Sequence, residues 1–153
     1  MRTELAYLAG FFDGEGCISI ACSKSQNGHR HELVIHIVST DWSACEAFRK
    51  ALGGAIYETK PRAAKRRTQW RWCLQGSSVP DALQRLYPFL RLERKRQAAK
   101  IAMEFSKHVT ARRNGRWSID RERNVPEIEI EHSFHARIKE ATQGRSAGDP
   151  VFR

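Results

Sequence analysis

The chain of 153 residues is 41% hydrophobic, which is enough for one folded domain with its own core. Its 27 Lys and Arg outnumber its 17 Asp and Glu, so the net charge is +10 and the sequence pI is near 10.0. This clustered positive charge favours nucleic acid as the partner over the simpler interpretation of a basic, merely soluble domain. No apolar run is long enough to cross a bilayer, so we expect no membrane partner.

The cysteines and the N-terminus indicate the compartment. The sequence has four cysteines, Cys17, Cys22, Cys45 and Cys73. They form no paired C-x-x-C spacing, so they give no reason to expect a zinc site, and a chain of this size does not need disulfides. We expect reduced thiols in a cytosolic compartment, and no secretion, because the N-terminus lacks the layout of a signal peptide. The two histidines of "HSFH" at 132 to 135 are expected on a helix surface.

The first predicted element is a helix with two costly glycines. Residues 5 to 20, "LAYLAGFFDGEGCISI", begin with apolar residues at helical spacing and end like a β-strand. Gly10 and Gly14 lie four residues apart on one face, although each costs a helix about 1 kcal/mol relative to alanine. Asp13 and Glu15 lie near the helix C-terminus, where the dipole disfavours carboxylates. Such a pattern indicates that this helix end has a function beyond its own stability.

A hairpin and a helix follow. Residues 17 to 24 and 31 to 39 read as two strands around the turn signal Asn27-Gly28. Thr40 or Asp41 can cap a helix over residues 42 to 52.

A second hairpin pairs residues 55 to 62 with residues 68 to 75 around the basic tip "AAKRR". In its second strand, one face carries Trp70, Trp72 and Leu74, and the other carries Gln69, Arg71 and Cys73. The Trp face is most simply the core, which leaves the Arg face for a ligand.

The rest of the chain is predicted to be mostly helical. A helix over residues 80 to 90 leads through a basic turn into a long helix that ends near residue 109. Residues 110 to 126 are polar and expected to be a loop, residues 127 to 142 a last helix, and residues 143 to 153 a loose tail.

This order of elements predicts an α+β fold with a four-stranded antiparallel sheet and helices on one of its faces. No repeat or linker divides the chain, so we expect a single domain over residues 1 to 153. Its core would span about residues 1 to 110, with a helical extension over about 111 to 142. The open face of two hairpins is wide enough to lie in a DNA major groove.

Three segments resemble one family. Residues 8 to 16, "LAGFFDGEG", resemble the LAGLIDADG motif of homing endonucleases. The "STD" after the second strand and "YPFLRLERKRQA" before the long helix also look like that family. The resemblance spans about the first two-thirds of the chain, and it implies an αββαββα fold whose sheet forms a DNA-binding saddle. A single copy of the motif implies a homodimer that cuts a long, near-palindromic duplex DNA site.

The resemblance also assigns chemistry to the first helix. The two glycines would let a helix from each protomer approach closely, so that two Glu15 carboxylates face one small volume. Glu15 then matches the metal-binding acid and the Gly14 carbonyl matches a backbone metal contact. Oxygen ligands of this kind suit Mg²⁺, for which Mn²⁺ can substitute. The expected interface residues are Leu8, Gly10, Phe11, Asp13 and Gly14.

Further catalytic and DNA-binding residues follow from their positions. Asp41 falls where the family has a polar residue near the scissile phosphate, and it is equally well explained as a helix cap. Lys95, or else Arg94, matches a basic residue that supports the transition state. The hairpins carry the expected DNA-binding residues, which are Lys24, Arg30, Glu32, Thr59, Lys60, Arg62, Lys65, Arg66, Arg67, Gln69 and Arg71.

Two other functions remain open at this point. A protein of this fold can instead bind DNA without cutting it, or act as a maturase that binds intron RNA. Besides the endonuclease and this non-cleaving binding protein, a basic structural or RNA-packaging protein is the third possibility. The host, whether a bacterium, a phage-infected cell or an organelle, and the choice between an intron and an intein origin do not follow from the residues.

Overall fold

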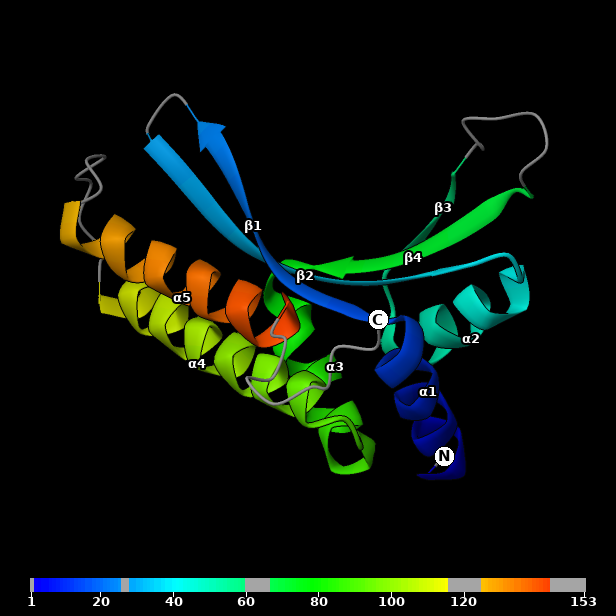
Figure 1. Ribbon diagram of the computed structural model, residues 1–153. Helices are drawn as coiled ribbons and strands as arrows, with labels where there is room; N and C mark the ends of the chain where they lie inside the picture. The colour runs from blue at the N-terminus through cyan, green and yellow to red at the C-terminus, as the bar shows by residue number, and fades with distance from the viewer. Residues whose placement is uncertain (1, 26–27, 60–66, 116–124, 144–153) are drawn as a thin grey trace, which may run out of the picture.

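A twisted four-stranded sheet lies across a layer of helices in the computed structural model, which describes residues 2–25, 28–59, 67–115 and 125–143 (Figure 1). The element order and the sheet confirm the predicted α+β class. Among the described residues, no helix is long and apolar enough to cross a membrane.

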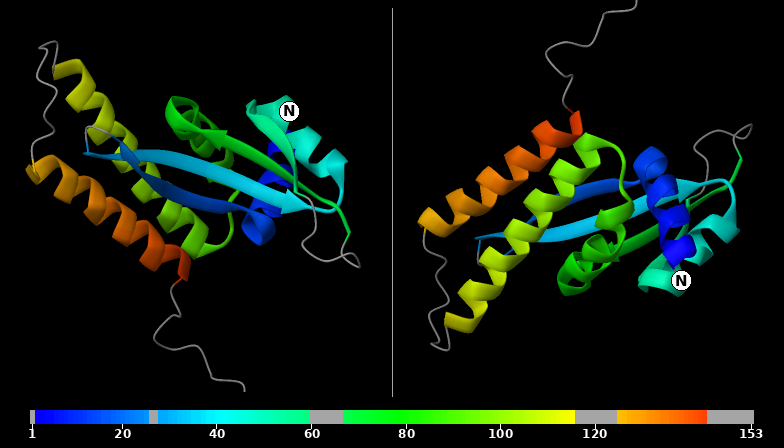
Figure 2. Two further views of the ribbon diagram at one scale, coloured as in Figure 1. Left: turned by 90° about the horizontal axis from the view of Figure 1, so that it is seen from above. Right: turned by 90° about the horizontal axis from the view of Figure 1, so that it is seen from below.

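The sheet has the strand order β1-β2-β4-β3, and all neighbours are antiparallel. The two hairpins therefore join along β2 and β4. The sheet curves upward at both ends, and none of the described helices covers its upper face (Figure 2). The strands are β1 (Cys17–Ser25), β2 (Gly28–Ser39), β3 (Ala55–Thr59) and β4 (Gln69–Gln75).

The described helices lie below the sheet in Figure 1, which places them behind the sheet in the left view of Figure 2 and in front of it in the right view. α4 and α5 run side by side under the β1–β2 hairpin, α2 lies under the other half, and α1 descends from the middle of the sheet. The helices are α1 (Arg2–Glu15), α2 (Trp42–Leu52), α3 (Val79–Leu86), α4 (Glu93–Gly115) and α5 (Val125–Gln143).

The core forms between this helical layer and the lower face of the sheet. Alternation along β2 buries Leu33, Ile35 and Ile37 on that face, because successive strand residues point to opposite sides. Trp72 of β4 is fully buried against them, and its Nε1 donates to the Gly53 carbonyl at 2.7 Å. The prediction that the Trp face of β4 belongs to the core is confirmed.

Several boundaries differ from the sequence prediction. β2 begins at Gly28 and not at residue 31, and α5 begins at Val125 and not at residue 127. The helix expected over residues 80 to 90 ends at Leu86, and a 3₁₀ turn over Tyr87–Phe89 replaces its last turn, since Pro88 has no N–H to donate. The expected loop after residue 109 is wrong for its first part, because α4 continues to Gly115. The predicted turn residue Asn27 lies outside the described residues, and so does the expected tail from residue 144.

Candidate active site and nucleic-acid interface

The C-terminal end of α1 reaches the sheet where β1 begins (Figure 1). Gly16 closes the helix by donating its N–H to the Phe12 carbonyl at 2.8 Å. A Cβ on Gly16 would lie 2.4 Å from Phe12, so only glycine fits this turn. Glu15 and Gly14 are exposed here, at the negative end of the helix, whose last carbonyls have no partner within the helix. A carboxylate and a backbone carbonyl thus offer oxygen ligands at one helix end.

Asp13 joins this helix end to the start of α4. Its side chain is only 6% exposed, and its Oδ2 accepts the N–H of Arg91 at 2.7 Å and that of Leu92 at 3.4 Å. These two residues immediately precede α4. Asp13 therefore fixes where α4 begins, and it is not on an exposed face that a partner helix can reach.

Lys95, in the first turn of α4, points back to the end of α1. It is 7% exposed, its Nζ donates to the Gly16 carbonyl, and Nζ lies 5.5 Å from the centre of the Phe12 ring. Burial lowers the pKa of Lys95, and the Arg94 charge lowers it further, against the opposing effects of Cys17, Asp13 and Glu15. An ammonium held this way is a preorganised positive charge beside Glu15.

A small cavity of about 160 Å³ opens beside the Lys95 ammonium. Gly16, Cys17 and Thr142 form its wall together with Arg94 and Lys95. Arg94 is exposed, whereas Lys95 is held by the fold, so the two candidates for the catalytic cation are not equivalent.

Asp41 is confirmed as the cap of α2. Its Oδ1 accepts the Ser43 N–H at 2.8 Å and the Ser43 hydroxyl at 2.7 Å, while its own N–H donates to Ser39 Oγ at 3.0 Å. The side-chain and backbone hydrogen bonds from Ser43 lower the pKa of Asp41. The carboxylate is exposed and ionised, so capping leaves it able to contact water or DNA.

Several predicted DNA-binding residues lie on the open face of the sheet. Arg71 pairs with Val38 on one side and Tyr57 on the other, and Thr59 pairs with Gln69. Arg71, Gln69 and Thr59 are exposed. Residues at directly paired positions, and residues two apart in one strand, share a face, so this part of the sheet presents a guanidinium, an amide and a hydroxyl group upward. Glu32 is partly exposed at a position paired with Ala21 on the same face, and Arg67 is exposed just before β4.

The other predicted contacts fall partly or wholly outside the description. Lys24 and Arg30 hold register positions opposite His29 and Ser23, and their side chains are not described. The hairpin-tip residues Lys60, Arg62, Lys65 and Arg66 lie outside the described residues.

His36 is a site residue that sequence reasoning missed. It is paired with Cys17 on one side and Cys73 on the other, at the middle of the open face. Burial lowers the pKa of His36, and the positive charges of Arg71 and Lys95 lower it further, so the imidazole is neutral at pH 7. The alternation of the strand could have identified it, since His36 lies between the core residues Ile35 and Ile37 and must therefore point to the opposite face of the sheet.

The glycines of α1 face open space. A Cβ added to Gly10 or Gly14 would meet nothing within 4 Å, so packing within the described part of one chain does not require glycine at either position. Tyr7, on the same side of the helix, is 62% exposed. The other predicted interface residues lie differently: Leu8 is fully buried in the core, and Phe11 is partly buried with its ring 6.0 Å from that of Phe48.

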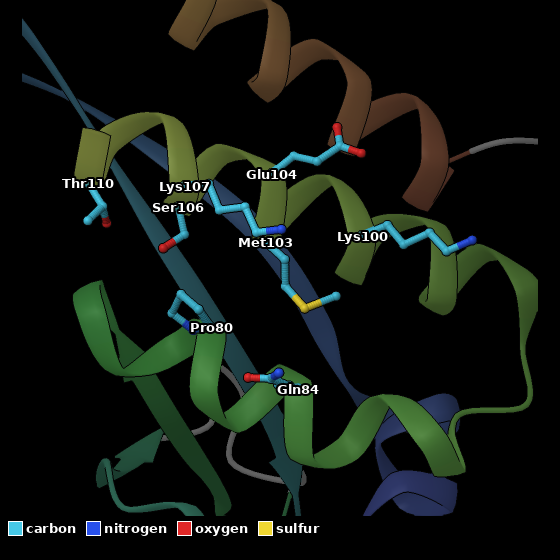
Figure 3. Close-up of a pocket in the computed structure, with 8 residues that line it drawn as sticks. All are labelled: Pro80, Gln84, Lys100, Met103, Glu104, Ser106, Lys107 and Thr110. Atoms are coloured by element: carbon cyan, nitrogen blue, oxygen red, sulfur yellow. The ribbon is translucent and has the colours of Figure 1, made fainter. Parts of the chain in front are cut away.

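A larger cavity, of about 630 Å³, lies elsewhere, in the groove between α3 and α4 (Figure 3). Pro80 and Gln84 line it from α3, and Met103 and Lys107 line it from α4. None of the predicted site residues lines this groove, so it is separate from the candidate active site.

Comparisons with known proteins agree with this geometry. A crystal structure of the homing endonuclease I-CvuI in complex with its target is 18% identical, with a TM-score of 0.71 over 97% of this chain and 87% of that chain. The archaeal intron-encoded homing endonuclease I-Vdi141I, complexed with DNA, is 16% identical, with a TM-score of 0.68 over 99% and 89%. The homing endonuclease I-GzeII, in complex with a DNA target, is 12% identical, with a TM-score of 0.62 over 95% of this chain and 46% of that chain.

These similarities show the fold, and the family follows from the sequence itself. The search of curated proteins found no match. A model of the LAGLIDADG endonuclease family matches residues 8–94, which include the C-terminal part of α1, both hairpins and the start of α4. This match covers more than half of the chain, and the protein therefore belongs to the LAGLIDADG endonuclease family.

Proposed function

We propose that the protein is a site-specific homing endonuclease that binds a long, near-palindromic duplex DNA site as a homodimer and hydrolyses one phosphodiester bond in each strand. The observation that carries the proposal is the end of α1, where exposed Glu15 lies beside the buried ammonium of Lys95. Similar folds are named homing endonucleases in their crystal structures with DNA.

The α1 helix supports the homodimer. Gly10 and Gly14 lie on its exposed side, where an added Cβ would meet open space, and they cost helix stability without serving packing among the described residues. A second copy of α1 fits there because small residues let two backbones approach closely. The matched part is 46% of the I-GzeII chain, which leaves room there for a second copy of the fold, whereas residues 1–153 carry the motif once.

The donor set at this helix end fits Mg²⁺. Glu15 and the Gly14 carbonyl are both oxygen ligands, which hard divalent cations prefer, and one protomer supplies only one carboxylate. A second Glu15 across the two-fold axis completes the set. The metal would supply an activated water and stabilise the leaving oxygen, and Mn²⁺ can substitute. The I-CvuI complexes were obtained in the presence of Ca in one case and Mg in another, which agrees with a divalent metal.

The chain's own residues supply the remaining functions. Lys95 holds a fixed positive charge where the phosphodiester gains negative charge. Asp41 orients water near the scissile phosphate from the start of α2. Arg71 and Gln69 read base edges from the open face, because guanidinium and amide groups match purine edges. Basic residues nearby add affinity through the phosphates.

A cleavage selection tests this function. The purified protein is incubated with a randomised duplex DNA library, with Mg²⁺ and in parallel with EDTA, and the broken ends are sequenced. We expect metal-dependent cuts at one near-palindromic site. Sequence-specific retention without cuts would replace the endonuclease by a DNA-binding protein or a maturase. Binding without sequence preference that weakens steeply with salt would indicate a packaging protein.

A further inference from the structure

A second cluster of ligand-type side chains lies at the outer half of the β1–β2 hairpin. Cys22 of β1 pairs directly with His31 of β2, and His132 of α5 reaches both. The potential ligand atoms of these three residues all lie within 4.8 Å of one another. The rings of His31 and His132 meet edge to face at 4.6 Å. We propose that Cys22, His31 and His132 form a zinc site that fastens α5 to the hairpin.

The spacing of the three atoms suits a metal. A point equidistant from three atoms 4.8 Å apart is about 2.8 Å from each, and zinc bonds are about 2.3 Å to sulfur and 2.0 Å to nitrogen. Shortening the distance of about 2.8 Å to these bond lengths needs side-chain movements of less than about 1 Å. Cys22 and His132 are exposed and able to make them, while buried His31 provides a fixed ligand.

The buried neighbour of His31 is a second, independent observation. Glu131 is 1% exposed, and its Oε2 lies 2.8 Å from Nδ1 of His31. A carboxylate bonded to one ring nitrogen is the usual support of a metal-binding histidine, because it fixes the tautomer and turns the other nitrogen towards the metal. In His31 that other nitrogen, Nε2, is also buried.

The ligand types identify the metal and distinguish it from the one proposed at Glu15. A thiolate with two imidazoles is a soft set that selects zinc over magnesium. Three protein ligands leave the fourth tetrahedral position to water. The cluster lies five residues along β1 from Cys17, which is about 17 Å of extended strand. It is therefore a separate site with separate chemistry.

The consequence is a cross-link between segments that are far apart in the sequence. His132 lies about 100 residues after the hairpin, and α5 packs along β1. A metal bound by all three residues would hold the C-terminal helix against the hairpin that presents the DNA-binding face. This role concerns stability of the scaffold and is independent of the cleavage reaction.

Metal analysis of the untagged protein tests the proposal. After expression in zinc-supplemented medium, we expect about one zinc ion per chain. In metal-free protein, added Co²⁺ should give the sulfur-to-cobalt charge-transfer absorption of a thiolate ligand. Cys22→Ser should abolish that absorption, and His132→Ala should weaken Zn²⁺ binding at least about 10-fold.

Matched variants make the result specific. Cys73→Ser removes another thiol, and His135→Ala removes another histidine of the same helix; both should retain the wild-type metal content and absorption. The proposal is overturned if wild-type protein holds no zinc and gives no charge-transfer band with Co²⁺. It is also overturned if Cys22→Ser binds the metal as tightly as Cys73→Ser does. The wild-type measurement decides even if a variant fails to fold.

Discussion

The two ends of β1 carry opposite chemistry. Near Cys17, α1 ends at the exposed residues Gly14 and Glu15, and the ammonium of Lys95 donates to the Gly16 carbonyl. Around Cys22, a thiol meets two imidazoles. Hard oxygen ligands favour magnesium, and sulfur with nitrogen favours zinc. The difference teaches that one strand can contribute to two proposed sites, of which the first is proposed to need a partner protomer and the second to be complete within one chain.

The largest effect is expected from blocking the surface of α1 with Gly10→Leu. The added side chain enters open space in the monomer, so the fold should survive, but it occupies the surface of α1 that we propose the partner helix contacts. We expect a monomer by light scattering and no detectable cleavage. The zinc content should stay at the wild-type level, which would show that the site proposed at Cys22 does not depend on the dimer proposed at α1.

Ala136→Leu is the matched control for that change. It adds a leucine at an exposed position of α5, away from α1, and should remain dimeric and active. A Gly10→Leu protein that is still a dimer and still cuts would show that α1 is not the interface.

Lys95→Met should have the next largest effect. We expect cleavage to fall about 100-fold, because the variant lacks the fixed charge beside the helix end. Burial lowers the pKa of Lys95, so its proton is bound less tightly in the folded state than in the unfolded state, and at neutral pH the charge opposes folding. The melting temperature should therefore be unchanged or higher in Lys95→Met.

The pH profile and a neighbouring variant refine this test. As the pH is raised, wild-type cleavage should decline before the pH reaches 10.5, the ordinary pKa of lysine. The reason is that Lys95, with its lowered pKa, loses its proton at a lower pH than an ordinary lysine does. Arg94→Met removes an exposed charge and should reduce cleavage less than Lys95→Met. A larger loss in Arg94→Met would reverse the assignment of the catalytic cation.

The smallest effect is expected at Asp41, where Asp41→Asn separates capping from charge. Asparagine caps as well as aspartate, so stability at pH 7 should hold, while single-turnover cleavage falls about 10-fold. In the wild type the pKa of Asp41 is lowered by folding, so its stabilisation is present above pH 3.8 and lost as the pH falls through the folded pKa. Melting curves recorded at decreasing pH should show that Asp41→Asn lacks the loss of stability that protonation of Asp41 causes in the wild type. Cleavage by Asp41→Asn at the wild-type rate would show that Asp41 serves only as a helix cap.

The sequence points to a site at the first end of β1 and not to one near Cys22 for a physical reason. Glu15 and Gly14 are consecutive in one motif, so their proximity does not depend on tertiary structure. The cluster of Cys22, His31 and His132 depends on strand register and on where α5 packs. The sequence-based argument against zinc used only spacing along the chain, which carries no information about such pairs.

Predictions about faces were accurate where alternation decided them and less accurate elsewhere. The Trp and Arg faces of β4 follow directly from the period of two. Leu8 and Asp13 were expected at the dimer interface, but the structure places Leu8 in the core and bonds Asp13 to the start of α4. A motif shows which residues belong together, whereas packing against α2, α3, β2 and the 3₁₀ turn over Tyr87–Phe89 determines which side of α1 stays exposed.

The most direct test of the central claim is cleavage of the selected DNA site by Glu15→Gln, with Glu4→Gln, a change at the other end of α1, as the control. The variant keeps the shape of the side chain and removes the negative charge that the metal needs. We expect Glu15→Gln to bind the site with wild-type affinity and not to cut it in Mg²⁺, and Glu4→Gln to cut normally. Cleavage by Glu15→Gln at the wild-type rate would contradict an active site built at the end of α1.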